Sequence, residues 1–187
     1  MSKVHELAKM IDHSILHPTL TDEDLKRECE VAKKYNVASV CVKPYMVSSA
    51  VALLKDTNVL VGCVIGFPAG NSKIAVKVFE TDYVAKEADL IKLCEICTKV
   101  GADYVKTSTG FGFVKGEDEK YSYEGATIPN LELMKKNVGP HVKVKAAGGV
   151  RTLDDLLAVQ KAGCTRCGAT ATTTIIEEAI EKFGNNG

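Results

Sequence analysis

The stretch Val142–Gly163, VKVKAAGGVRTLDDLLAVQKAG, contains the pattern that decides the fold. It begins with a short apolar run that ends in Lys145, turns through a Gly-Gly pair, and continues with helical spacing. Thr152 stands before two acidic residues, as at a helix start, and Gly163 follows the last periodic residue, as at a helix end. The stretch therefore predicts a strand, a turn and a helix, the repeating unit of parallel α/β proteins.

Strand-like and helix-like runs alternate in the same way along much of the chain. The early units repeat about every 20–30 residues, as βα units do. At 187 residues, the chain fits one α/β domain over residues 1–187. The predicted strands are Met10–Leu16, Ala38–Val42, Leu60–Ile65, Tyr104–Lys106, Val142–Lys145 and Arg166–Ala169. The predicted helices include Thr21–Tyr35, Pro44–Lys55, Thr152–Ala162 and Thr174–Phe183.

The alternation breaks in the stretch Lys73–Gly101, which has no internal glycine or proline. Its apolar residues recur with largely helical spacing, and a single helix of this length would measure roughly 40 Å at about 1.5 Å per residue. Such a helix is too long to flank a compact sheet. We therefore predict two abutted helices with no strand between them, and an absent strand-containing piece near Val84–Asp89.

The composition argues against several classes of partner and setting. Lys+Arg and Asp+Glu are both 24, so no basic surplus favours nucleic acid or an anionic membrane. The N-terminus lacks the apolar core of a signal peptide, and no apolar run is long enough to span a bilayer. The seven cysteines are an odd number and lie mostly in apolar runs, which fits reduced thiols. We expect a cytoplasmic protein without nucleic-acid or membrane partners.

Two predicted strand ends carry the candidate chemistry. Tyr104–Gly110 reads YVKTSTG and Val144–Arg151 reads VKAAGGVR, so each lysine follows an apolar run and precedes small residues. Repulsion between two ammonium groups, together with desolvation, favours the loss of one proton. Lys106 and Lys145 therefore point to Schiff-base chemistry, and the Gly-Gly pair could bind a phosphate. The alternatives are an ordinary surface lysine at a strand end and an ordinary glycine turn.

Several other polar residues are open to more than one interpretation. Asp12 could orient a lysine or relay protons, whereas His13 fits a structural or surface role. Lys143 points to the same side as Lys145, and we expect it to snorkel or to pair with an acid.

Two cysteine pairs have the spacing of zinc ligands, Cys94 with Cys97 and Cys164 with Cys167. The first pair lies inside a helical pattern, and 66 residues separate Cys97 from Cys164. We therefore expect cysteines of the core and no metal, with a zinc or redox module as the weaker alternative.

Taken together, the motifs resemble those of deoxyribose-phosphate aldolase, a class I aldolase family with a TIM-barrel fold. They occur in the family's order from end to end of the chain. The matching segments are Ile11–His13, Ser39–Pro44, Val64–Pro68, Lys106–Gly110, Val144–Thr152 and Arg166–Ala169.

The resemblance implies that Lys106 forms a Schiff base with the sugar aldehyde, and that Lys145 is the neighbouring cation that lowers the pKa of that amine. Cleavage of 2-deoxyribose 5-phosphate would release glyceraldehyde 3-phosphate and leave an acetaldehyde enamine on Lys106. The implied substrates are a phosphorylated sugar and aldehydes, with no cofactor and no metal. The oligomeric state stays open, with a homodimer as one option.

The resemblance also assigns residues to substrate and phosphate binding. Backbone N–H groups at two glycine-containing turns would hold the phosphate, and other residues match positions at the rim. The phosphate-binding residues would be Gly148, Gly149, Gly168 and Thr170, and the rim residues Asp12, Cys41, Thr109 and Gly110.

The chain departs from the family pattern in three places. The strand that carries a proton-shuttling aspartate, and the strand after it, have no counterpart, a shortfall of roughly 40–50 residues against eight βα units. Phe113–Tyr123 is a charged insertion after Lys106, either a lid or a solvated loop. The last strand runs into Thr170 and Ala171, so one hydroxyl of the usual serine pair is missing.

The shortfall has three competing explanations. The natural protein carries an internal segment that this chain lacks, the chain is an inactive truncated relative, or about six units rearrange or dimerise to cover the gap. We favour the first, because six strands cannot close with eight-strand geometry and both lysine motifs are intact. An intact mass well above 20.1 kDa would support it. A catalytically impaired phosphosugar-binding protein is the alternative function.

Overall fold

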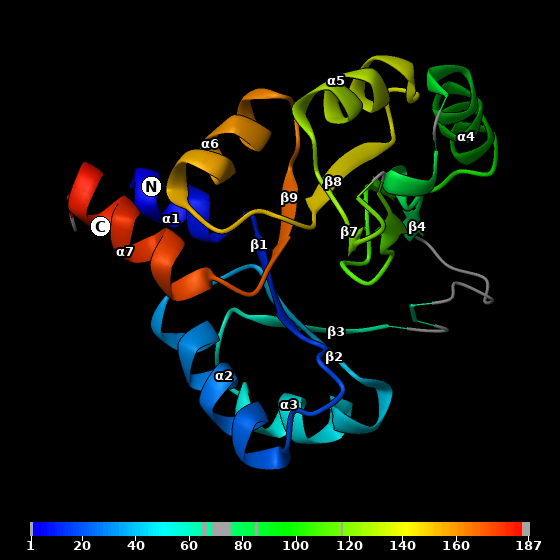
Figure 1. Ribbon diagram of the computed structural model, residues 1–187. Coiled ribbons are helices and arrows are strands. Elements are labelled where there is room, and N and C mark those ends of the chain that lie inside the picture. Colours follow the sequence, from blue (N-terminus) through cyan, green and yellow to red (C-terminus); the bar gives the residue numbers. More distant parts are fainter. Residues whose placement is uncertain (1, 65–66, 69–75, 85, 117, 185–187) are drawn as a thin grey trace. The chain divides into compact units, whose positions relative to one another are not determined.

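The computed structural model describes residues 2–64, 67–68, 76–84, 86–116 and 118–184 (Figure 1). Strands and helices alternate along the chain, and all six predicted strands are present. The chain divides into two compact units. The first comprises Met1–Ile65, Arg151–Leu156 and Gly168–Gly187, and the second comprises Gly66–Val150 and Leu157–Cys167.

The first unit is built on three parallel strands in the order β3-β2-β1. Asp12 lies opposite Ser39, and Ser39 lies opposite Leu60, so the strand ends are in register. Helices α2 and α3 contact each other on one side of these strands (Figure 1). The elements are α1 (Lys3–Ala8), β1 (Ile11–Ile15), α2 (Asp22–Lys34), β2 (Ser39–Val42), a 3₁₀ turn (Pro44–Met46), α3 (Val47–Leu53), β3 (Leu60–Cys63) and α7 (Thr172–Phe183).

The second unit is built on the parallel strands β4, β5 and β8, with β5 in the middle. Helices α4 and α5 contact each other beside them (Figure 1). The elements are β4 (Val76–Val78), a 3₁₀ turn η2 (Thr81–Tyr83), α4 (Glu87–Lys99), β5 (Tyr104–Lys106), β6 (Val114–Lys115), β7 (Tyr121–Ser122), α5 (Ile128–Asn137) and β8 (Lys143–Ala147). Both α6 (Leu153–Lys161) and β9 (Arg166–Ala169) contribute residues to each unit.

The helix boundaries predicted from capping signals are confirmed. Thr21 and Asp24 form a capping box at the start of α2, and hydrogen bonds from Thr21 lower the pKa of the Asp24 carboxyl to about 2. The Thr152 hydroxyl accepts a hydrogen bond from the Asp155 N–H at the start of α6. Gly163 follows α6 with φ of 93°, a conformation that glycine adopts without strain.

The prediction of two abutted helices in Lys73–Gly101 is wrong. β4 is a strand in this stretch, with Val78 opposite Lys106 of β5, and α4 is its one α-helix among residues 76–84 and 86–101. A strand of three residues is too short to show alternation within a helix-like pattern. Residues 73–75 lie outside the described part of the chain.

The position predicted for the missing piece is also wrong. β4, α4 and β5 form an uninterrupted βαβ unit, so nothing is absent near Val84–Asp89. The break precedes β4, because the residues 64–75 are far fewer than the roughly 30 that a βαβ unit takes. With β4, the described residues contain seven strands of the parallel sheet, one fewer than a complete barrel needs. The prediction that two strands are missing and six strands remain is therefore wrong by one strand.

His13 is a structural residue of the first unit, in agreement with the sequence. Its ring is buried on β1, with Nδ1 2.8 Å from the Thr172 hydroxyl and Nε2 3.0 Å from the Glu28 carboxylate. Burial lowers the pKa of His13 below 6.5, although the Glu28 carboxylate opposes this shift. The neutral ring is therefore the form that the fold stabilises.

We predict that His13 makes the fold sensitive to acid. Because its pKa is lower in the folded state, the unfolded chain binds the proton first as pH falls below 6.5, and the free energy of unfolding decreases. Urea unfolding at about pH 7.5 and about pH 5.5 should show a smaller acid-induced loss for His13→Asn than for the unsubstituted chain. An equal loss in both proteins would contradict this assignment.

Candidate active site

The pairing of β5 with β8 brings the two predicted lysines together. Lys106 lies directly opposite Lys145 in the parallel ladder, and Tyr104 lies opposite Lys143. Residues opposite each other on paired strands extend from the same face, and the strands are about 4.8 Å apart. Lys106 and Lys145 are both half-buried. The second unit thus brings the two amines onto adjacent strands, as the sequence predicts. Lys106 is the last residue of β5, whereas Lys145 lies in the middle of β8, because β8 continues two residues beyond the predicted end.

Lys143 differs from Lys145 in its surroundings. It is exposed, and its Nζ lies 5.9 Å from the centre of the Tyr104 ring. The expectation that it snorkels to the surface is confirmed, and the contact that the structure shows is with an aromatic ring.

A single peptide group connects Lys106 to an acid of the β4 end. The Lys106 ammonium donates to the Ser108 carbonyl, and the Thr109 N–H of the same peptide donates to Glu80 Oε1 at 2.8 Å. Glu80 has a left-handed backbone, with φ of 51°, directly after β4. Its carboxylate therefore fixes the peptide on which the Lys106 amine rests.

Thr107 and Ser108 are buried, although both are polar. The Thr107 hydroxyl donates to the Ala147 carbonyl at 2.8 Å and accepts from the Ala147 N–H at 3.0 Å. This exchange continues the connection between the β5 and β8 segments beyond the last residue of β5. The hydroxyl-rich segment after Lys106 therefore has a structural role, because Thr107 binds the backbone at the end of β8. This role is separate from any contact with a ligand.

The Gly-Gly turn after β8 has the backbone that only glycine adopts readily. Gly148 and Gly149 have φ of 92° and 84°. The backbone of Gly125 packs directly on Gly148, because a Cβ added to Gly125 would lie 2.7 Å from the Gly148 carbonyl carbon. The turn thus presents backbone without side chains, which suits close approach of an anion.

Thr109 and Gly110 lie in the loop that follows Lys106. The Thr109 N–H donates a hydrogen bond to Glu80. The Thr109 hydroxyl accepts one from the Phe111 N–H at 3.1 Å. Gly110 has φ of 85° and no described atom within 4 Å of an added Cβ. The Thr109 hydroxyl can still donate to a ligand, and Gly110 leaves room beside it.

The first unit holds the remaining predicted residues. Asp12 is buried on β1 and accepts a hydrogen bond of 2.6 Å from the Ser39 hydroxyl, while Cys41 on β2 is half-buried. Gly168 and Thr170 lead into α7, whose first turn carries no acidic residue. A helix start of this kind favours an anion. This unit thus supplies a buried carboxylate from the beginning of β1 and, after β9, the start of α7.

The cysteine pairs do not have the character of zinc sites. Cys94, Cys97, Cys164 and Cys167 are all buried. Burial raises the pKa of Cys94 and of Cys164 to about 12, which keeps both as thiols at neutral pH. Across the described ranges, no cluster of three or more His, Cys, Asp or Glu side chains could hold a metal ion.

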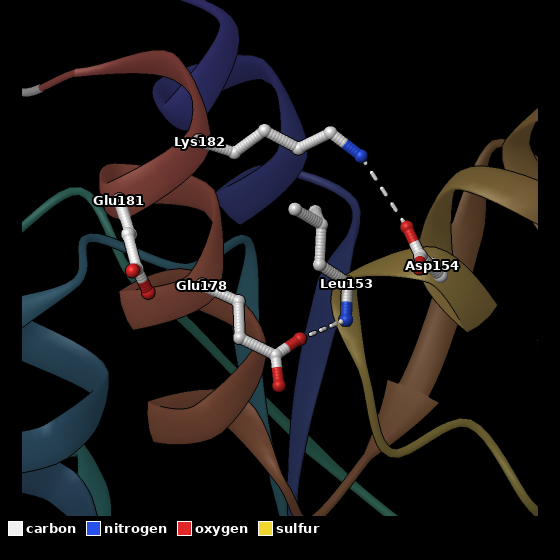
Figure 2. Close-up of a pocket in the computed structure, with 5 residues that line it drawn as sticks. All are labelled: Leu153, Asp154, Glu178, Glu181 and Lys182. Carbon is white, nitrogen blue, oxygen red and sulfur yellow. Dashed lines mark hydrogen bonds and ion pairs between the residues drawn. The ribbon is translucent and has the colours of Figure 1, made fainter.

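A surface cavity of about 360 Å³ lies in the first unit, and none of the predicted site residues lines it. Figure 2 shows that it lies between α6 and α7 and that two pairs of the residues that line it are in contact. Glu178 accepts from the Leu153 N–H at 2.7 Å, and Lys182 lies 3.4 Å from Asp154. These contacts connect the start of α6 to α7, and we assign the cavity no ligand.

Sequence reasoning missed the acids that follow β4. Glu80 and Asp82 both accept hydrogen bonds from loops beside the lysine pair. The available signal was the polar run Glu-Thr-Asp after a short apolar segment, which is the same pattern of a strand end that identified Lys106.

Comparisons with known proteins agree with this arrangement. No protein-family model matches the chain. A deoxyribose-phosphate aldolase of Caldanaerobacter subterraneus is 37% identical over 92% of this chain and 93% of its own length. One of Clostridium perfringens is 38% identical, over 94% of this chain and 96% of the relative.

Solved structures give the same answer. A protein from Coccidioides immitis, provisionally assigned as deoxyribose-phosphate aldolase, has a TM-score of 0.82 at 29% identity and covers 95% of this chain and 87% of its own. A tetrameric deoxyribose phosphate aldolase from Aeropyrum pernix, 20% identical, shares the fold with a TM-score of 0.80, over 94% of this chain and 92% of that one.

The chain belongs to the deoxyribose-phosphate aldolase family. Its fold is of the TIM-barrel type of these aldolases, and it is incomplete. The alignment with the Caldanaerobacter aldolase extends over 224 positions, whereas 92% of this chain is only about 172 residues. That aldolase therefore has roughly 50 residues without a counterpart here, which confirms the predicted shortfall.

We predict that Gly125 is essential for packing in this aldolase chain. Ala at Gly101, where φ is 69° and the space is open, should cost about 1–2 kcal/mol of unfolding free energy from backbone strain alone. Gly125 has a similar φ of 74°, and the Cβ of Gly125→Ala would also collide with the Gly148 backbone. We therefore expect Gly125→Ala to lose about 1–3 kcal/mol more unfolding free energy than Gly101→Ala. Urea unfolding of both variants tests this, and equal losses would show that the Gly125 contact does not matter.

Proposed function

We propose that this chain is a class I aldolase that cleaves 2-deoxy-D-ribose 5-phosphate to acetaldehyde and D-glyceraldehyde 3-phosphate. The observation that carries the proposal is the register of β5 and β8, which sets Lys106 opposite Lys145 on neighbouring strands. Two amines so placed are suited to forming a Schiff base, and the family relationship supplies the substrate.

In this proposal Lys106 is the nucleophile. Its neutral amine attacks the C1 aldehyde, and loss of water with uptake of one proton gives an iminium ion. A base removes the proton of the C3 hydroxyl, the C2–C3 bond breaks, and its electron pair moves into the enamine on Lys106. Glyceraldehyde 3-phosphate leaves. Protonation of the enamine at C2 and addition of water then release acetaldehyde and restore the amine.

Lys145 is proposed to favour the reactive form of Lys106. Two ammonium groups about 5 Å apart, roughly one strand spacing, repel each other by about 3 kcal/mol at an effective dielectric constant of about 20. The repulsion disappears when Lys106 loses its proton, so the charge of Lys145 favours the neutral amine of Lys106. Lys145 then remains as a proton donor beside the reacting carbon atoms.

The phosphate of the substrate is assigned to backbone groups. The resemblance to the family names two sets of N–H groups. In the second unit these are at Gly148 and Gly149, whose positive φ values suit an anion-binding turn. In the first unit they are in the segment Gly168–Thr170, where the dipole of α7 favours an anion. Thr109 and Gly110, with Asp12 and Cys41, are assigned to the remainder of the substrate. Acetaldehyde and phosphorylated sugars are thus the proposed partners.

A cytoplasmic setting is part of the proposal. None of the seven cysteines, all of which the structure describes, is joined in a disulfide, which suits a reducing compartment. Among the described helices, none has the length and apolar character needed to cross a bilayer. The suggested homodimer stays a prediction.

We predict that borohydride will trap the substrate on Lys106. Reduction in the presence of 2-deoxyribose 5-phosphate should add the mass of the reduced adduct to a peptide that contains Lys106, and Lys106→Met should abolish this. Lys145→Met should slow trapping at neutral pH and recover at higher pH, because the neighbouring charge is gone. Lys143→Met is the matched control and should trap like the unsubstituted protein. Unchanged labelling of Lys106→Met would contradict the assignment of Lys106 as the nucleophile.

We also predict slow turnover by this 187-residue chain. The strand that would carry the proton-shuttling aspartate of the family has no counterpart, and loss of a general acid–base group costs about 10²-fold or more. Steady-state kinetics beside the Clostridium perfringens relative should show this deficit. Comparable kcat values would refute it. Phosphate binding without any trapping would instead support a phosphosugar-binding protein.

A further inference from the structure

The short turn after β4 holds both ends of the insertion that distinguishes this chain. The Tyr83 hydroxyl donates to the Phe113 carbonyl at 2.9 Å, at the start of the insertion. At its other end, the Asp82 carboxylate accepts from the Glu124 N–H. Between these anchors β6 and β7 form an antiparallel hairpin. The hairpin is therefore fastened at its base by adjacent residues of one turn.

Gly125 is fixed through both of its backbone groups. Its N–H donates to Asp82 Oδ2 at 3.1 Å and to Oδ1 at 3.2 Å, and its carbonyl accepts from the buried Thr81 hydroxyl at 3.1 Å. A carboxylate that accepts from two successive N–H groups is a strong, charge-assisted anchor. The position of Gly125 is thus set by the turn after β4.

The segment Glu124–Ala126 in turn lies against the Gly148–Gly149 turn. The Ala126 N–H donates to the Gly148 carbonyl at 3.0 Å. An added Cβ on Gly148 would lie 3.1 Å from the Gly125 Cα, and one on Gly149 would lie 3.3 Å from the Glu124 carbonyl oxygen. This backbone contact leaves little room for movement, so the conformation of the Gly-Gly turn depends on where Gly125 is held.

We propose that Asp82 is a positioning residue for phosphate binding. It acts through Glu124 and Gly125, which support the Gly148–Gly149 turn, and it does not itself contact the phosphate. The inference rests on the proposed function, which assigns the phosphate to that turn. A displacement of about 1 Å can cost up to about 10²-fold in a bound or reacting complex, so loss of the anchor should be measurable.

Asp82 also reaches towards the nucleophile. The Ser108 hydroxyl lies 3.5 Å from Asp82 Oδ2, at the limit of a hydrogen bond. The shorter and more numerous contacts run to Glu124 and Gly125, so the larger effect of substitution should fall on phosphate binding. A substrate with and without its phosphate separates the two effects.

The test uses the whole chain with three variants at or near the turn. Asp82→Ala removes every acceptor, whereas Asp82→Asn retains Oδ1 and should recover part of the loss. Asp118→Ala is the matched control, because Asp118 is an exposed acid near the hairpin tip that pairs with Lys120. Calorimetric titration with inorganic phosphate should show binding about tenfold weaker or more for Asp82→Ala, and unchanged for Asp118→Ala.

Kinetics supply the second readout. Asp82→Ala should raise KM for 2-deoxyribose 5-phosphate by about tenfold, with a much smaller change in kcat/KM for unphosphorylated 2-deoxyribose. Equal losses on both substrates would overturn the proposal, since a general loss of structure does not distinguish them.

The outcomes separate this inference from the proposed function. Weaker phosphate binding by Asp82→Ala supports the inference even if no Schiff base is trapped. Phosphate affinity equal to that of the unsubstituted protein, or no phosphate binding by the unsubstituted protein, overturns it. If circular dichroism shows that Asp82→Ala does not fold, the phosphate affinity of Thr81→Val is measured in its place, because Thr81→Val removes the hydrogen bond to the Gly125 carbonyl. Unchanged phosphate affinity of that variant overturns the proposal.

Discussion

The candidate chemistry in the second unit depends on the register of one strand pair. Parallel pairing of β5 with β8 sets Lys106 opposite Lys145, and a slip by one residue would turn one amine to the other face. The Thr107 hydroxyl fixes this register, because it both donates to and accepts from the Ala147 backbone just beyond the lysines. A buried side chain thereby prolongs the ladder where the strand itself ends.

The turn after β4 extends this constraint to the loops on both sides. Glu80 fixes the Ser108–Thr109 peptide, whose carbonyl receives the Lys106 ammonium, and Asp82 fixes Gly125 against the Gly-Gly turn. The left-handed backbone of Glu80 costs about 1–2 kcal/mol, and charge-assisted hydrogen bonds to backbone N–H groups can offset that cost. The turn that follows a strand of only three residues thus positions both the segment that binds the Lys106 amine and the predicted phosphate turn.

The sequence predicted those elements whose signals are local. Lys106 and Lys145 each follow an apolar run, and the ends of parallel strands meet at one edge, so their proximity could be inferred. The capping box at Thr21 is likewise local. β4 was missed because three strand residues cannot establish a period among helix-spaced neighbours, and the roles of Glu80 and Asp82 were missed with it. Gly125 could not be anticipated, because its packing on Gly148 is a contact between distant segments.

The location of the break explains why the lysine pair retains its geometry. β5 is hydrogen-bonded to β4 on one side and to β8 on the other, so it is an interior strand of the second unit's sheet. The residues that the family has and this chain lacks precede β4. Among the described residues, β4 is the last strand on that side of the sheet, and a strand edge favours association. The missing residues take no hydrogen bond from β5. What the break removes is the strand expected to carry the proton-shuttling carboxylate. Schiff-base formation thus depends on strands that this chain retains, whereas proton transfer by that carboxylate depends on a strand that it lacks. A trapped adduct alone would not establish turnover.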